Sequence, residues 1–214
     1  MVSKTTAEVT RVAAGDDGER YDGLEMTLHW LTAVLVVALF GLAETWDFAP
    51  RGSVLRHGMQ DLHVSLGLSL IVVILARIAW RIGPGRRVRP ATSGLVELAS
   101  RIVHYALYGL LLIEVVLGVL FRWANHDPLS LFGLLTIPAA VDFSKDGRHL
   151  IGEAHNYVAI TIVALAGLHA AAALFHHYWL RDNVLWRMLP GLRARQAERR
   201  RPEPETIERR AARP

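Results

Sequence analysis

The sequence predicts an all-α protein, a transmembrane antiparallel four-helix bundle. Of its 214 residues, 52% are hydrophobic, and the mean hydropathy of +0.26 is high for a soluble domain of this size. The hydrophobic residues are gathered into four long runs, each able to cross a hydrocarbon core of about 30 Å. Because lipid offers the backbone no hydrogen-bond partners, such runs must form helices.

The apolar runs divide the chain into three segments. Residues 1–23 form a polar, flexible extension, residues 24–190 the membrane domain, and residues 191–214 a basic tail that we expect to be disordered. The first run, residues 28–43, lacks a small-residue cleavage site, so we expect it to stay in the membrane. The expected spans are residues 24–45, 62–82, 99–121 and 151–179.

The basic residues predict the orientation of the chain. They are concentrated in the link between the second and third spans and in the tail, so both should face the cytoplasm. Four spans then place both termini in the cytoplasm. We expect the protein in the inner membrane of a bacterium, with its tail against anionic lipid. The net charge of +4 and the pI near 9.8 are explained by this pattern, and we expect no nucleic-acid partner. The arginines concerned are Arg81, Arg86, Arg87 and Arg89 in the link, with Arg181, Arg187, Arg193 and Arg195 in the tail.

The chain contains no cysteine and ten histidines. The missing thiols exclude disulfides, cysteine-ligated iron–sulfur clusters, thiolate zinc sites and covalently attached c-type haem. An electron carrier in this chain would therefore be bound without a covalent link, and b-type haem is the natural choice for histidine ligands.

Four histidines lie at matching depths in the predicted helices. His155 and His169 are fourteen residues apart, which at about 100° and 1.5 Å per residue places them on one helix face, roughly 21 Å apart. His29 starts the first span on the cytoplasmic side, and His63 starts the second on the periplasmic side. Depth therefore pairs His29 with His169 and His63 with His155. Each pair could hold one b haem through two imidazoles, an arrangement suited to electron transfer.

Other interpretations of these residues remain open. Each histidine could instead bond between helices, or the set could form a zinc site or a proton pathway, although Glu153 is the only acidic residue that the sequence places close by. His104 starts the third span at the depth of His29 and His169 and competes for the same axial positions. Glu114, in the middle of the third span, could be a protonated acid within the bundle, part of a proton path, or a residue near the membrane surface.

Two arginines and one histidine are candidates for further contacts with a haem or a quinone. Arg77 and Arg81 share a helix face and could bind haem propionates, or they could anchor the helix end as snorkelling cations. His176, two turns after His169, could serve a quinone near the cytoplasmic haem, or it could belong to an aromatic belt. Between the third and fourth spans, LFGLLTIP (residues 131–138) predicts a short interfacial helix or a loop.

Basic side chains in the periplasmic connections could form a positive patch that attracts a small anion, although acids lie among them. The residues concerned are Arg51, Arg56, His57, Arg122, His126, Lys145, Arg148 and His149.

Three segments carry a resemblance to a known family. They are LHWLTAVLVVALFGLAE (28–44), DLHVSLGLSLIVVILARIAWRI (61–82) and EAHNYVAITIVALAGLHAAAALFHHYWLRDNVLWRMLP (153–190). Over roughly residues 22–190 the chain resembles the bacterial cytochrome b561 family, which are four-helix membrane proteins with two haems. The most specific motif is GLHAAAALFHHYWLRDN with a histidine fourteen residues upstream of its first histidine.

The resemblance implies a function and a set of ligands. The chain is similar in particular to family members that oxidise superoxide and reduce ubiquinone, which implies two haems b and a periplasmic donor. It implies His29 and His169 as ligands of one haem iron, His63 and His155 of the other, and His104 as a non-ligand. The alternative is a quinone-linked electron-transfer subunit that works with a redox partner protein, such as a dehydrogenase or hydrogenase. A histidine-lined metal or proton transporter is a third reading.

Overall fold

The computed structural model describes residues 21–84, 94–181 and 185–188. The predicted extension at residues 1–23 lies outside the described residues except for its last three, and the predicted tail at residues 191–214 lies outside them entirely.

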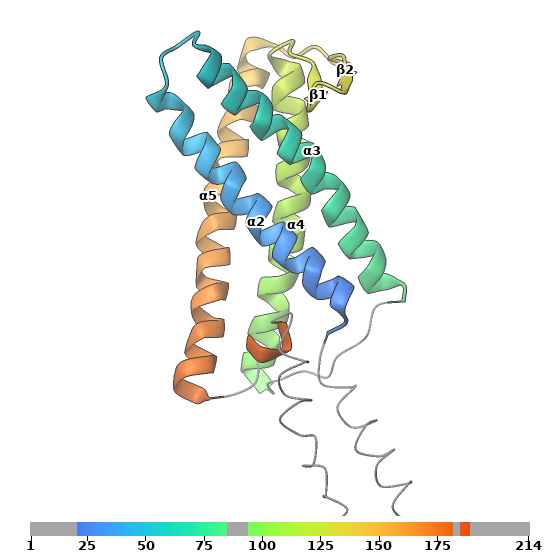
Figure 1. Cartoon of the computed structure of the whole chain (residues 1–214), viewed down its shortest axis with the longest axis vertical. Coiled ribbons are helices and arrows are strands. Elements are labelled where there is room, and N and C mark those ends of the chain that lie inside the picture. Colours follow the sequence, from blue (N-terminus) through green and yellow to red (C-terminus); the bar gives the residue numbers. More distant parts are fainter. Residues whose placement is uncertain (1–20, 85–93, 182–184, 189–214) are drawn as a thin grey trace, which may run out of the picture.

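Four long helices make up the described part of the chain (Figure 1). They are α2 (Gly23–Thr45), α3 (Val54–Ile82), α4 (Gly94–Ala124) and α5 (Lys145–Phe175). Shorter elements are η1 (Trp46–Phe48), β1 (Leu129–Leu131), β2 (Leu135–Ile137), a π-helical turn η2 (His176–Leu180) and η3 (Leu185–Met188). The prediction of four antiparallel helices is confirmed.

The helices pack as two pairs, α2 on α3 and α4 on α5, with α3 also contacting α4. In Figure 1, α2 and α3 slant across the steeper α4 and α5. A small apolar cluster is buried where the helices cross. Its buried members are Leu35, Leu70, Ile74, Leu111 and Ile162.

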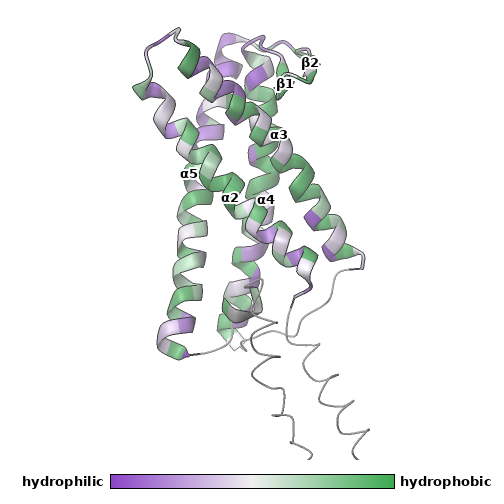
Figure 2. Cartoon of the chain, viewed as in Figure 1, coloured by the Kyte–Doolittle hydropathy of each residue, from purple (hydrophilic) through white to green (hydrophobic). Residues whose placement is uncertain are grey.

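The outer surface of the bundle is apolar. Each of the four helices is long and hydrophobic enough to cross a membrane, yet only 6% to 22% of its most apolar window is buried within the chain. Figure 2 shows hydrophobic residues along the middle of the helices and hydrophilic ones gathered toward the ends. Exposed apolar surface of this extent requires lipid rather than water as its solvent, so the fold is a transmembrane four-helix bundle.

The helices begin earlier than the apolar runs do. α3 starts at Val54 rather than Leu62, and α5 at Lys145 rather than residue 151. Ser53 and Ser144 cap these two helices by accepting hydrogen bonds from the amides of Arg56 and Gly147. Hydropathy marks only the lipid-embedded part of a helix, whereas the caps mark where its backbone begins.

The connection between α4 and α5 differs from the prediction. Instead of a short helix or a loop alone, it contains an antiparallel hairpin in which Leu129 pairs with Ile137 and Leu131 with Leu135. Phe132 and Gly133 both have positive φ, and the amide of Leu134 donates to the carbonyl of Leu131 at 2.9 Å. Two consecutive left-handed residues suit the twist of a tight hairpin. The Phe-Gly pair is a weaker hairpin signal than Asn-Gly, which is why the sequence did not predict it.

The two ends of the bundle can be told apart by what joins the helices there. At the hairpin end, Ser65 of α3 donates to the carbonyl of Ser130 of β1 and accepts from the amide of Phe132. At the opposite end, here called the terminal end, α2 begins and α5 finishes. There the N-cap Asp22 accepts a hydrogen bond from Nε1 of Trp80 at 2.9 Å.

Candidate functional site

The structure brings the four predicted histidines together in two pairs. The ring centres of His29 (α2) and His169 (α5) lie 6.4 Å apart at the terminal end. The ring centres of His63 (α3) and His155 (α5) also lie 6.4 Å apart, toward the hairpin end. All four rings are half-buried. The structure thus brings together the histidines that depth pairs, with His104 as a third ring beside His169 at the terminal end.

The separation within each pair fits one iron between two imidazoles. Such an arrangement needs about 2.0 Å for each metal–nitrogen bond and about 1.1 Å from each nitrogen to its ring centre, or about 6.2 Å in all. The observed 6.4 Å in both pairs is close to this value. The spacing of each pair therefore fits one iron held between two histidines, as in a b-type haem.

His104 does not fit an axial position as well as its neighbours do. Its ring centre lies 5.1 Å from that of His169, which is too close for an iron between them. Its Nδ1 also donates a hydrogen bond to the carbonyl of Ser100, one turn earlier on α4, at 2.6 Å. These contacts make His104 a neighbour of the terminal-end pair.

The second ring nitrogen of His63 has a partner that suits metal ligation. Its Nδ1 lies 3.0 Å from the carbonyl of Leu39 on α2. A carbonyl can only accept, so Nδ1 carries the proton and Nε2 keeps its lone pair. A hydrogen bond from the second ring nitrogen to a carbonyl is how metal-binding histidines are held in orientation. Trp46 packs against the same ring of His63, with the ring centres 5.3 Å apart.

His29 has a different partner. Its Nδ1 lies 2.9 Å from a terminal nitrogen of Arg77 on α3, and a guanidinium can only donate. Nδ1 of His29 therefore accepts. For Nε2 of a neutral His29 to bind iron, its Nδ1 would have to carry the proton instead, so Arg77 would have to turn to another acceptor.

The two candidate propionate arginines are placed differently. Arg77 lies over the ring of Tyr108 at 4.9 Å, and its Nε is buried with no hydrogen-bond partner among the described residues. Arg81 is already paired with the buried carboxylate of Glu25 at 2.9 Å. Of the two, Arg77 is the one whose binding capacity within the bundle is incompletely used.

One residue near the hairpin-end pair was not assigned from the sequence. An oxygen of Glu114 on α4 lies 3.1 Å from Nδ1 of His155. The expectation that only Glu153 accompanies these histidines is therefore wrong; Glu153 instead faces His149 at 3.6 Å. Glu114 and His155 lie in different helices and far apart in sequence, and only the packing of α4 on α5 brings them together.

His176, the predicted quinone residue, is half-buried at the terminal end. It begins the π-helical turn η2, and its backbone amide donates to the carbonyls of Ala172 and Ala173. Single π-helical turns within α-helices are frequently found at functional sites. The C-cap of the turn is Arg181, whose φ of 54° is left-handed.

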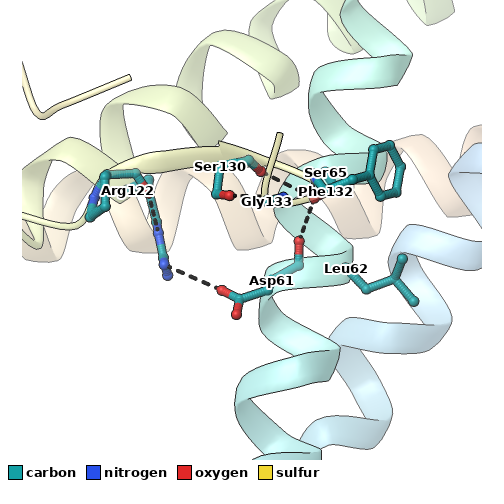
Figure 3. Close-up of a pocket in the computed structure, with 8 residues that line it drawn as sticks. Asp61, Leu62, Ser65, Arg122, Ser130, Phe132 and Gly133 are labelled. Atoms are coloured by element: carbon teal, nitrogen blue, oxygen red, sulfur yellow. Dashed lines mark hydrogen bonds and ion pairs between the residues drawn. The ribbon is translucent and has the colours of Figure 1, made fainter. Parts of the chain in front are cut away.

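A cavity of about 380 Å³ lies at the hairpin end, between α3, α4 and the hairpin (Figure 3). Arg122 lies on one side of it, 3.7 Å from Asp61 and 3.4 Å from Asp127. Other basic side chains of the predicted positive patch are paired as well, Arg56 with Asp47 at 2.5 Å and His126 with Asp142 at 3.3 Å. Arg56, Arg122 and His126, three members of the patch, therefore each face a carboxylate. The cavity residues are Asp61, Leu62, Ser65, Arg122, Pro128, Ser130, Phe132 and Gly133.

Comparison with known proteins gives one family. The sequence profile of prokaryotic cytochrome b561 matches residues 20–191. Cytochrome b561 homolog 2 of Escherichia coli is 33% identical over 172 residues, which cover 80% of this chain and 92% of the relative. A protein of Yersinia pestis named "Probable superoxide oxidase" is 30% identical over 173 residues, covering 80% of this chain and 97% of its own. Cytochrome b562 of Cereibacter sphaeroides is 31% identical over 173 residues, which cover 79% of this chain and 94% of the relative.

The matched region contains the whole described bundle and all four paired histidines. Its helices have the length and hydropathy of membrane spans, and its histidine pairs fit b-type haem. The chain belongs to the prokaryotic cytochrome b561 family of membrane electron-transfer proteins that bind b-type haem.

Proposed function

We propose that the chain is a superoxide:ubiquinone oxidoreductase that takes electrons on the periplasmic side of the membrane. Two superoxide ions would give up one electron each and leave as dioxygen. One ubiquinone would take both electrons and two protons to become ubiquinol, so that atoms and charges balance. The observation that carries the proposal is the pair of equal 6.4 Å histidine separations near opposite ends of one bundle.

Two haems b would be held by the chain's own histidines. His29 and His169 would provide the axial nitrogens of one, and His63 and His155 those of the other. When bound, the haems supply the one-electron redox chemistry, while the protein supplies ligands, orientation and electrostatics. Bis-histidine ligation fills both axial positions and suits electron transfer rather than oxygen binding.

Arg77 would bind a propionate of the haem at the terminal end. Its present contact with Nδ1 of His29 is incompatible with iron on Nε2 of a neutral imidazole, so loading would release the guanidinium. A propionate is a suitable new acceptor because a guanidinium binds carboxylates through two parallel hydrogen bonds. Arg81 would remain with Glu25 and support this end indirectly.

The two sides of the membrane would have different roles. By the positive-inside rule the hairpin end faces the periplasm and both termini the cytoplasm of a bacterium. Superoxide would be oxidised at the hairpin end. At the terminal end, His176 would donate a proton to a reduced quinone as a general acid. The Yersinia relative's name supports this choice of donor.

The second candidate function is an electron-transfer subunit that passes electrons between a partner protein and quinone. It is favoured by the neutralised charges at the hairpin end, where Arg122, Arg56 and His126 each face a carboxylate. Such a surface would attract superoxide weakly. A subunit of this kind would need its partner for turnover.

The test is an optical spectrum of the detergent-purified chain, with a pyridine haemochrome count and superoxide as the reductant. The proposal expects two haems b per chain, rapid reduction by superoxide, and reoxidation by added ubiquinone. Two haems that superoxide leaves oxidised, but that dithionite reduces, would favour the subunit. A colourless protein would contradict both and point to a histidine-lined metal or proton transporter.

A further inference from the structure

We propose that three residues of α4, Glu114, Gly118 and Phe121, hold the imidazole of His155 in place. We propose also that the carboxylate of Glu114 lowers the reduction potential of the haem held by His155. These three residues are here called the His155 seat. The inference rests on the proposed function in one respect, that His155 is a haem ligand.

The seat is built on one face of α4. Glu114, Gly118 and Phe121 follow one another at intervals of four and three residues, which places them in a single row along the helix. Since α4 packs along α5, this row faces the segment of α5 that carries His155. One helix can therefore fix both the position and the proton of a ring that belongs to the next.

Glu114 supplies the chemical part of the seat. One of its oxygens lies 3.1 Å from Nδ1 of His155, and the two side chains are only 14% and 23% exposed. Nδ1 and the second carboxylate oxygen make no hydrogen bond with other described residues, and the 3.1 Å contact itself lacks hydrogen-bond geometry. A small rotation of either group would complete the bond, with Nδ1 donating and Nε2 left for the iron. Carboxylate–imidazole–metal arrangements of this kind raise the basicity of the ligand.

Gly118 and Phe121 supply the steric part. A Cβ atom at Gly118 would lie 3.3 Å from Cε1 of His155, so the ring edge occupies the space that a larger side chain would need. The Phe121 ring stacks on the imidazole, with centres 6.3 Å apart and planes 19° from parallel. Gly152 on α5 in turn makes room for Phe121, because a Cβ there would meet Cε2 of Phe121 at 2.7 Å.

The seat makes the two haem sites electrostatically unequal. At the hairpin end, the carboxylate of Glu114 faces His155, whereas at the terminal end the cation of Arg77 lies beside His29 and would stay at that end when it turns to a propionate. Negative charge beside a ligand stabilises the oxidised iron, and positive charge stabilises the reduced iron. Electrons would therefore move downhill from the hairpin end to the terminal end, which is the direction that the proposed function needs.

The test is a spectroelectrochemical titration of the purified holoprotein and its E114Q variant. Glutamine keeps the shape and an acceptor oxygen but removes the charge. We expect the reduction equilibrium constant of one haem to rise about tenfold, which is about 59 mV for one electron, while the other haem is unchanged. E114L, which also removes the acceptor, should shift it further. The matched control is E153Q, which removes a half-exposed carboxylate two residues from His155 and should change neither haem by more than about twofold.

A second readout tests the positioning itself. The low-spin electron paramagnetic resonance signal of a bis-histidine haem depends on the relative orientation of its two rings. F121L, which removes the stacked ring, should therefore shift the g values of one haem at unchanged haem content. This measurement decides the matter if E114Q fails to fold.

The outcomes separate this inference from the proposed function. If each haem has the same reduction potential in E114Q, E153Q and the wild type, and the g values of F121L are unshifted, the His155 seat is overturned. The proposed function would still stand. A wild-type chain without haem would overturn the proposed function. Two haems that titrate as described, but that superoxide does not reduce, would support the seat and contradict the proposed donor.

Discussion

The histidines of this bundle differ most in what their Nδ1 atoms contact. His63 faces a backbone carbonyl, His155 a carboxylate, His29 a guanidinium and His104 the carbonyl of its own helix. A partner that accepts leaves Nε2 free to bind a metal, while a partner that donates does not. The chemical state of each ring is therefore decided by one neighbouring atom.

His104 should be dispensable for haem binding, whereas His169 should not. We expect H104Q to keep two haems per chain, because the ring centre of His104 is only 5.1 Å from that of His169, too close for an iron between them. H169Q should lose one haem and keep the other. A pyridine haemochrome count per chain measures both variants. A single haem in H104Q and two in H169Q would mean that the ligands of the terminal-end pair are misassigned.

Arg77 and Arg81 should separate a redox effect from a stability effect. R77Q removes a half-buried cation next to His29 and should lower the reduction equilibrium constant of one haem by about three- to tenfold, or about 30–60 mV. R81Q leaves the buried carboxylate of Glu25 without its ion pair and should destabilise the bundle by about 1–3 kcal/mol. Redox titration and thermal unfolding of both variants check this. The reverse pattern would contradict the assignment of Arg77 to a propionate.

At the scale of the helix, a spacing of seven residues organises the interior. In α5 the buried Ile162 lies seven residues from both His155 and His169, and in α3 the buried Leu70 lies seven residues from both His63 and Arg77. Seven residues are close to two helical turns, so each helix presents polar, apolar and polar side chains in one row. The apolar cluster thus fills the space between the two histidine pairs.

The glycines of α4 allow a prediction about this row. G118V would push a branched side chain into the ring of His155, because even a Cβ atom would lie 3.3 Å from Cε1. We expect this variant to lose one haem. G109V in the same helix is the matched control, since a Cβ there meets nothing within 4 Å. Its haem content should stay at two. Equal haem content in the two variants, measured by the pyridine haemochrome method, would show that the ring is not confined at Gly118.

The sequence predicted the helices well because each is determined by a long apolar run and by lipid. It also predicted the histidine pairs, because depth along a straight helix follows from residue number alone. It could not predict the contact between Glu114 and His155, since that depends on which face α4 turns toward α5. The hairpin was missed for a related reason, because its turn residues, Phe132 and Gly133, carry a weak local signal.

The whole molecule is polar at its ends and apolar around its middle, and its two ends carry different charges. Arginines follow α3 in sequence, whereas the hairpin end balances its cations with acids such as Asp61, Asp127 and Asp142. The inward-facing side of a bacterial membrane protein is the one rich in unbalanced Lys and Arg in its short connections. The terminal end should therefore face the cytoplasm, and electron entry at the hairpin end would be open to the periplasm.

The absence of cysteine makes this orientation directly testable, because a single introduced thiol is the only one in the chain. Leu134, at the hairpin turn, is 87% exposed, and Leu95, in the first turn of α4, is 83% exposed. In spheroplasts, a membrane-impermeant maleimide should label L134C at once and L95C only after the membrane is permeabilised. Matched exposure of the two positions makes accessibility across the membrane the deciding variable. Labelling of L95C alone in intact spheroplasts would show that the bundle has the opposite orientation. Superoxide produced outside the cell would then have no path to the His63–His155 pair.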